Sequence, residues 1–173
     1  IKSSQEISYI RKAADTCKAA IRGCIDSIEE GVTENDIAAA TYYSSIKAGS
    51  EYLGHAMLVT NGQRGGLGFT TWERNPIQQG DSVFLEMGGT YKRYNACLSR
   101  GVVLGEPSDL IKRLADASRG ALERAIEAMK PGATSASVDQ AARGYIESLG
   151  LGEHFKHRCG YLIGIGFPPD WGE

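Results

Sequence analysis

The amino-acid sequence predicts an α+β domain built from two related halves. Each half has a long helix, a glycine turn, a second helix with a capped start, and then a strand. The two turns, Gly31-Val-Thr33 and Gly132-Ala-Thr134, lie about a hundred residues apart, which is longer than the period of solenoid repeats. The second half stops after its first strand. We therefore expect a pseudo-symmetric domain with a truncated second half and a site where the copies meet.

Composition and charge narrow the class of protein. The 173 residues are 42% hydrophobic and 23% charged, which suits one globular domain with a sizeable core. Nineteen basic and 21 acidic side chains give a net charge of −2 without a basic run, which argues against nucleic acid or a membrane surface as partner. No apolar run reaches the roughly 20 residues of a membrane span, and no signal peptide opens the sequence. We expect a cytoplasmic protein, and the start at Ile1 indicates a fragment.

Apolar residues at helical spacing predict four helices, and apolar runs predict strands. Ser3 or Ser4 is expected to cap the first helix, and the pair Thr33 and Asp36 forms a capping-box pattern before the second. The expected helices are residues 5–29, 33–47, 108–129 and 137–150, and the expected strands are 55–60, 83–85, 90–104 and 154–166.

The stretch around Glu86 is the most informative part of the sequence. The apolar run from Val83 to Leu85 is typical of a buried strand, and Glu86 places a carboxylate at its end. Gly88-Gly89 favours a tight reversal before the returning strands. A carboxylate that emerges from a core strand is costly to desolvate unless it has a partner. Glu86 is therefore either half of a structural ion pair or a functional group.

The four cysteines do not form a zinc-binding pattern, because none has CxxC spacing. Cys17 and Cys24 lie seven residues apart on one helical face and are expected to pack as small apolar side chains. The glycine-rich segment from Gly65 to Trp72 lacks both GxGxxG spacing and a Walker lysine, so we do not expect a phosphate-binding loop.

Several short phrases occur in a characteristic order. They are Ile1-Lys2-Ser3 with Glu6-Ile7, Gly80-Asp81 with Glu86-x-Gly88, Tyr94 with Arg100, Lys130-Pro131-Gly132 with Asp139, and His157-x-x-Gly160-Tyr161-x-x-Gly164. Over residues 1–173 the chain resembles the catalytic domain of the creatinase, prolidase and methionine aminopeptidase superfamily, which has the pita-bread fold. The resemblance implies that the C-terminal strands and a small N-terminal domain are missing here. It also implies a homodimer, in which that N-terminal domain covers the partner's site.

The resemblance implies a metal site that this sequence only partly retains. Metallopeptidases of the superfamily bind two metal ions through two aspartates, a histidine and two glutamates. The first aspartate falls on Glu86, the second on Cys97 and the histidine on Tyr161, and the two glutamates would lie beyond residue 173. One carboxylate, a thiol and a phenol do not suit a hard divalent ion. We therefore expect no metal cofactor; the alternative is two divalent ions, Mn, Co or Zn.

Glu86 is the first candidate for catalysis, as a general base or as a carboxylate that holds a cationic substrate. His157 matches a substrate-side histidine of the superfamily and can shuttle protons near neutral pH, although it is equally typical of an exposed turn. Tyr161 is expected either to donate a hydrogen bond to substrate or to fill the vacated metal space. Phe69 stands where creatinase and the peptidases carry a catalytic histidine. We expect it to contact substrate, although a phenyl ring cannot transfer protons.

Two further side chains are candidates for substrate binding. Trp72, together with Trp171, is expected to line the pocket, although aromatic residues more often belong to a core. Arg100 is expected to contact substrate or to pair with a buried carboxylate, with Glu86 as a candidate.

Three functions remain open. The one we favour is metal-independent hydrolysis of a C–N bond in a small zwitterionic substrate, as in creatinase and ectoine hydrolase, which the closing phrase from His157 resembles most. The second is a metal-dependent Xaa-Pro dipeptidase or aminopeptidase that acts on a dipeptide. The third is a binding module that has lost catalysis, which is favoured by Phe69, Cys97 and Tyr161.

Overall fold

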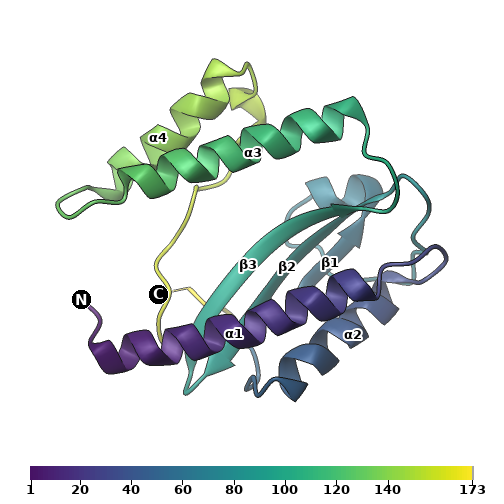
Figure 1. Ribbon diagram of the computed structural model, residues 1–173, viewed down its shortest axis with the longest axis horizontal. Helices are drawn as coiled ribbons and strands as arrows, with labels where there is room; N and C mark the ends of the chain where they lie inside the picture. The colour runs from purple at the N-terminus through teal and green to yellow at the C-terminus, as the bar shows by residue number, and fades with distance from the viewer. Residues whose placement is uncertain (173) are drawn as a thin grey trace. The chain divides into compact units, whose positions relative to one another are not determined.

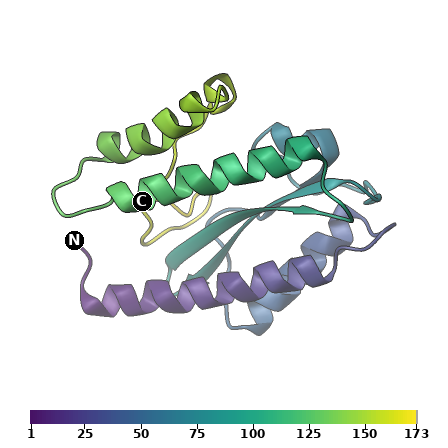
Figure 2. The same cartoon turned by 45° about the horizontal axis from the view of Figure 1, so that its top comes forward.

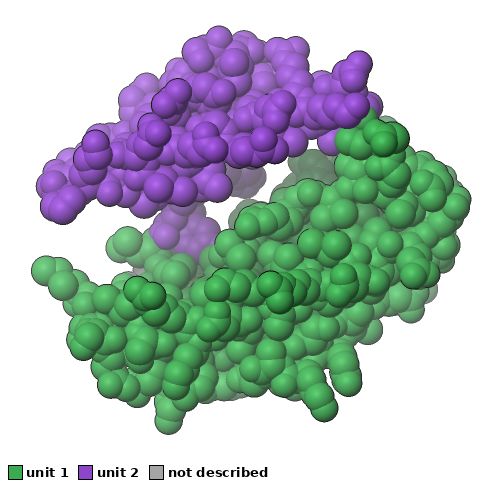
Figure 3. Space-filling model, in the orientation of Figure 1, with its two compact units in different colours: residues 1–107, 162–173 green, residues 108–161 purple. Residues whose placement is uncertain are grey.

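The computed structural model describes residues 1–172 and divides into two compact units (Figure 3). Unit 1 comprises residues 1–107 together with the chain from Leu162 onward, and unit 2 comprises residues 108–161. None of the described helices combines the length and apolarity needed to cross a lipid bilayer.

Unit 1 is built on a three-stranded antiparallel sheet with the order β1-β2-β3. β1 spans Leu58–Asn61, β2 spans Ser82–Tyr91 and β3 spans Tyr94–Val103. A short 3-10 helix, Gly62–Gly66, follows β1. The register places Glu86 of β2 between Leu58 of β1 and Ser99 of β3.

Two helices cover one side of this sheet (Figure 1). α1 spans Ser4–Asp26 and α2 spans Glu34–Lys47. Each begins with a full capping box, formed by Ser3 with Glu6 and by Thr33 with Asp36, which confirms the predicted caps. The core between helices and sheet consists of Cys17, Ala20, Ile21, Cys24, Ile37, Ala38, Met57, Val59, Ile77, Val83, Leu85 and Met87.

The two α1 cysteines are part of this core, as predicted. Burial raises the pKa of the Cys17 thiol to about 12 and that of Cys24 to about 11. Both thiols therefore stay protonated at neutral pH and pack as small apolar groups.

Alternate residues of β2 point to opposite sides of the sheet. Val83, Leu85 and Met87 face the helices, so Glu86 faces the other way. Because directly opposed residues of antiparallel strands share a side, the register defines the members of this second face. We name it the Glu86 face; it carries Leu58, Phe84, Glu86, Gly88, Cys97 and Ser99.

Unit 2 is a pair of helices that lie side by side (Figure 2). α3 spans Asp109–Ala128 and α4 spans Ser135–Ser148, and a 3-10 helix, Gly152–His154, follows. The face of α3 that carries small side chains packs on α4. The contact is formed by Ala117, Ala121 and Ala125 of α3 with Ala142 and Ile146 of α4. Larger apolar side chains of α3 are exposed, namely Leu110, Leu114, Leu122 and Ile126, and so is Met129 at its C-cap.

The predicted internal repeat is present in the backbone. Gly31 and Gly132 have nearly the same left-handed φ, 87° and 88°. Thr33 and Thr134 each cap a helix of 14 residues, and a left-handed glycine follows each of these helices. The cap of α4 is Thr134 with Ser137 as its partner, so the predicted start at Ser137 was late.

The predicted reversal at Gly88-Gly89 was wrong, because β2 continues through both glycines. The chain turns instead at Lys92 and Arg93, whose φ values of 51° and 63° suit a two-residue hairpin turn. The two glycines allow neighbouring groups to approach the sheet closely. A Cβ at Gly89, for example, would overlap α1 at Ala13 and Thr16.

The predicted strand over residues 154–166 is also absent. Its first part is a 3-10 turn and irregular chain, and only single bridges join Ile163 to Gly172 and Ile165 to Tyr94. Its glycines and scattered apolar residues instead form an extended segment that returns to unit 1, where Asn95 donates a backbone hydrogen bond to the Gly164 carbonyl at 2.9 Å.

Candidate functional site

Glu86 is held in place by its strand rather than by a side-chain partner. β2 is paired on both edges around it, and the side chain is half-buried. Within residues 1–172 the Glu86 carboxylate forms no hydrogen bond or ion pair. A half-buried carboxylate without a partner is available to a ligand.

The segment from Leu162 onward places an indole over the Glu86 face. Trp171 is 4% exposed, and a Cβ at Gly88 would come within 2.9 Å of its Cε3. Buried Asn95 holds the segment by donating from Nδ2 to the Gly166 carbonyl at 3.4 Å, while its Oδ1 accepts from the Thr90 hydroxyl at 2.7 Å. Gly88 is thus required for the indole to reach the sheet.

An imidazole that sequence reasoning missed lies against this indole. The ring centroids of His55 and Trp171 are 5.0 Å apart, and those of His55 and Phe69 are 6.3 Å apart. His55 Nδ1 is 2.6 Å from the Ala56 carbonyl oxygen. Residues 55–60 resemble a simple strand in sequence, and the contact partner lies more than a hundred residues away, so no local signal marked this histidine.

The loop that carries Phe69 is tied to the start of α2 by one buried carboxylate. Glu34 is fully buried and accepts hydrogen bonds from the backbone N–H groups of Asn61 and Glu73, both at 2.7 Å. It also pairs with Arg64, which donates to the Thr71 carbonyl at 2.9 Å. Phe69 itself has a φ of 55° and is 73% exposed.

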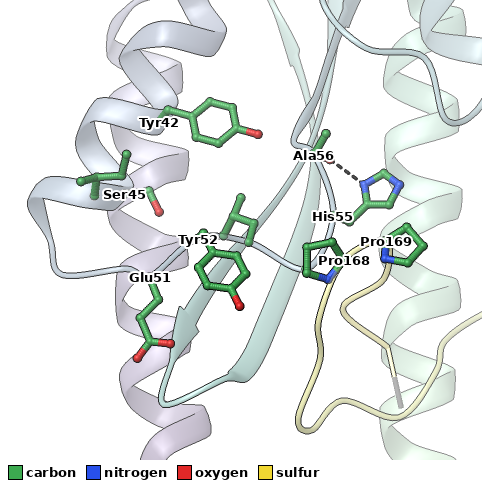
Figure 4. Close-up of a pocket in the computed structure, with 11 residues that line it drawn as sticks. Tyr42, Ser45, Glu51, Tyr52, His55, Ala56, Pro168 and Pro169 are labelled. Carbon is green, nitrogen blue, oxygen red and sulfur yellow. Dashed lines mark hydrogen bonds between the residues drawn. The ribbon is translucent and has the colours of Figure 1, made fainter.

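A cavity of about 550 Å³ opens beside His55 (Figure 4). Its walls come from the end of α2, from the chain before β1 and from the returning segment. Figure 4 shows the imidazole beside Pro169 and its hydrogen bond to Ala56. The lining residues are Tyr42, Ser45, Ile46, Glu51, Tyr52, Leu53, Gly54, His55, Ala56, Pro168 and Pro169.

The suggested pairing of Arg100 with Glu86 is not formed. Arg100 lies opposite Leu85 in the register, so it points to the helix side of the sheet and away from the Glu86 face. Its side chain is exposed and donates to the Ser99 carbonyl at 2.7 Å.

Trp72 packs against the helix-side core. Its ring meets Tyr42 edge-on, with centroids 5.8 Å apart. That contact accounts for its half-buried state, and its role in substrate binding stays a prediction.

His157 lies in unit 2, on the chain that follows α4. Arg143 of α4 donates to the His157 carbonyl at 3.1 Å and to the Asp139 carboxylate at 2.9 Å. Asp139 also accepts the Cys159 backbone N–H at 3.2 Å. The hydrogen bond from Arg143, followed by that from Cys159, lowers the pKa of Asp139. The backbone around His157 is therefore fixed, while its side chain is exposed.

Tyr161 is the other predicted site residue of unit 2. It is 39% exposed, and the Arg158 guanidinium lies over its ring, 4.8 Å from the centroid. Its expected hydrogen bond to a substrate stays a prediction.

A protein-family comparison matches residues 8–171 to a model described as metallopeptidase family M24. The chain belongs to metallopeptidase family M24. This match confirms the resemblance inferred from the short phrases. The pita-bread fold is confirmed as well, because a prolidase structure superposes closely on this chain.

Relatives of this M24 chain include Xaa-Pro dipeptidases and an ectoine hydrolase. The Xaa-Pro dipeptidase of Pyrococcus horikoshii is 32% identical over 95% of this chain and 47% of its own length. The ectoine hydrolase of Halomonas elongata is 32% identical over 100% of this chain and 45% of its own length. The chain thus spans about half the length of the curated relatives it matches.

Two solved structures give the same result. The prolidase from Pyrococcus furiosus superposes with a TM-score of 0.93 at 31% identity, over 96% of this chain and 50% of the prolidase. The X-Pro aminopeptidase from Thermotoga maritima has a TM-score of 0.91 at 33% identity, over 96% and 47% of the two chains.

The side chains at the M24 metal positions do not by themselves supply a two-ion centre. Glu86 on β2 gives one carboxylate. Cys97 gives a thiol on the same face, at the diagonal position of the neighbouring strand β3. Hard divalent ions favour several oxygen or imidazole ligands that converge. No group of three or more His, Cys, Asp or Glu side chains forms such a set in the part of the chain that the structure describes.

Proposed function

We propose that this chain is part of a hydrolase that splits a C–N bond in a small zwitterionic substrate without a metal ion. The observation that carries the proposal is Glu86: a half-buried carboxylate with no partner among residues 1–172, beside a thiol where a metallopeptidase would need a second carboxylate. The ectoine hydrolase among the relatives supports the choice of a small substrate.

Each candidate side chain has a part in the proposed reaction. Glu86 takes a proton from the attacking water; if Glu86 instead holds the cationic end of the substrate, His157 takes that proton. The water oxygen bonds to the substrate carbon, the C–N bond breaks, and His157 is proposed to give the leaving nitrogen its proton. The other side chains proposed to contact substrate are Phe69, Trp72 and Tyr161, whereas Arg100 points away from the Glu86 face.

A metal-dependent Xaa-Pro dipeptidase is the second candidate. The family is described as a metallopeptidase family, and prolidase has the same fold over this region. In this case two divalent ions, Mn, Co or Zn, would be held partly by residues outside the described chain, with Glu86 as one ligand.

Metal analysis and kinetics of the purified full-length protein separate the two candidates. We expect substoichiometric metal after growth with Mn and Zn, and turnover of ectoine or creatine that survives chelators. Glu86→Gln is expected to lower kcat by about 100-fold or more, because the carboxylate contacts the reacting molecule. Glu73→Gln removes an exposed carboxylate of the same unit and should leave kcat unchanged.

Two other outcomes of these measurements would replace the proposed function. Tightly bound metal together with chelator-sensitive cleavage of Ala-Pro would replace the proposal with the dipeptidase. Absence of turnover with ectoine, creatine and Ala-Pro would favour a binding module.

We also propose that the protein is a homodimer in the cytoplasm, with neither nucleic acid nor membrane as partner. Light scattering would test the homodimer, and cell fractionation would test the location.

A further inference from the structure

His55 is the one imidazole of unit 1, because the other two histidines of the sequence, His154 and His157, belong to residues 108–161. The proposed hydrolysis needs a group that takes a proton from water and later returns one to nitrogen. An imidazole does both near neutral pH.

The Trp171 indole links His55 to the side of the sheet that carries Glu86. The indole of Trp171 contacts the sheet at Gly88, where an added Cβ would be 2.9 Å from the ring. Gly88 and Glu86 are two residues apart on β2 and point to the same side. The imidazole packs on that indole at 5.0 Å between centroids. The imidazole is therefore joined through the indole to the face that carries the Glu86 side chain.

The hydrogen bond of His55 fixes which ring nitrogen can act. A carbonyl oxygen only accepts, so the contact of 2.6 Å to the Ala56 carbonyl requires a proton on Nδ1. In the neutral ring Nε2 then carries the lone pair. Within residues 1–172 no hydrogen bond occupies Nε2. The ring is thus oriented by one nitrogen and leaves the other available as a base.

The ring is accessible to a small molecule. His55 is half-buried, and it borders the cavity of about 550 Å³ whose nearby walls include Tyr52, Pro168 and Pro169 (Figure 4). A largely apolar wall with one basic nitrogen is a common arrangement for a small-molecule site.

We propose that His55, in place of His157, is the acid–base residue of this hydrolysis and that Glu86 holds the cationic group of the substrate; the inference rests on the proposed function. Nε2 takes a proton from water as the water oxygen forms its bond to the substrate carbon. The C–N bond then breaks, and the imidazolium returns that proton to the leaving nitrogen. The ring ends neutral, and no other reactant is consumed.

Steady-state kinetics of the full-length protein tests this assignment, with ectoine, creatine and Ala-Pro as probes. His55→Asn keeps an N–H donor near the Ala56 carbonyl but lacks Nε2. We expect kcat to fall by about 100-fold or more, with KM changed by less than about threefold. The acidic limb of the pH profile of kcat should disappear in the residual activity, which a merely structural role would not cause.

His154→Asn is the matched control, because His154 is an exposed histidine of unit 2 whose ion partner is Glu153. It should keep the wild-type kcat. If circular dichroism shows that His55→Asn is unfolded, His55→Gln serves as the second variant. A folded His55 variant with wild-type kcat overturns the role of His55 and leaves the hydrolase intact. A wild type that turns over none of the probes overturns the proposed function, and the role of His55 with it.

Discussion

Gly88 and Gly89 are neighbours on β2, yet they admit different groups to opposite faces of the sheet. Gly89 lets α1 approach so closely that a Cβ would overlap the Ala13 carbonyl and the Thr16 hydroxyl. Gly88 lets the Trp171 ring come into contact with the Glu86 face. In sequence the pair resembles a turn, because the contacts that require glycine come from residues more than 70 positions away.

Gly89→Ala is expected to destabilise unit 1. The new methyl group meets backbone of α1, which cannot move without shifting the helix, so we expect a loss of about 1–3 kcal/mol in the free energy of unfolding. Gly101→Ala is the control on β3, because a Cβ there meets nothing within 4 Å. Urea denaturation of both variants measures the difference. Equal stabilities would show that α1 does not approach the sheet this closely.

The carboxyl group of Glu6 makes the first helix cap dependent on pH. Hydrogen bonds from Ser3, and then from the Tyr94 hydroxyl, lower its pKa from 4.5 to about 2. A depressed pKa in the folded state stabilises the fold above the unfolded value. The contribution is therefore complete above pH 4.5 and is lost as the pH falls toward 2.

NMR titration of the Glu6 side-chain carboxyl carbon measures this shift. We expect a midpoint near 2 in the wild type and a higher one in Tyr94→Phe, because that variant loses the bond of 2.9 Å to Oε1. Titration at 4.5 in the wild type would show that the capping box is open in solution.

At the scale of elements, the loop between β1 and β2 depends on Glu34. This carboxylate is fully buried and binds both Arg64 and backbone N–H groups on either side of the loop. The loop positions Phe69 beside His55. The sequence contains no motif for such an anchor, because Glu34 resembles an ordinary first-turn helix residue.

Glu34→Ala is expected to cost about 2–4 kcal/mol in the free energy of unfolding, because it leaves buried backbone donors without a partner and removes the buried carboxylate that pairs with Arg64. Glu73→Ala removes the second carboxylate of Arg64, which is 61% exposed, and should cost less than about 1 kcal/mol. Thermal unfolding compares the two. A similar cost for both would mean that Glu34 is not buried in solution.

Helices were predicted better than strands for a physical reason. Capping boxes and apolar stripes are local, so α1 to α4 were found within a few residues of their observed ends. The extent of β2 and the absence of a strand over residues 154–166 depend on pairing partners elsewhere in the chain. Alternation alone does not reveal those partners.

For the whole molecule, the repeat of helix, glycine turn and capped helix was visible in the sequence because the same glycine and threonine recur. The candidate site was only partly visible. Glu86 was identified from its place after an apolar run, whereas His55 gains its significance from Trp171, far along the chain. The face to which Arg100 points followed only from the observed register.

Unit 1 is discontinuous, because the chain builds its sheet and helices, then all of unit 2, and only then returns with Trp171. Domains generally form as the chain emerges from the ribosome. The sheet and its helices therefore emerge well before the indole that covers Gly88. Until residues 162–172 have been synthesised, the Glu86 face lacks this wall, so this part of the candidate site forms only after all of unit 2 has been made.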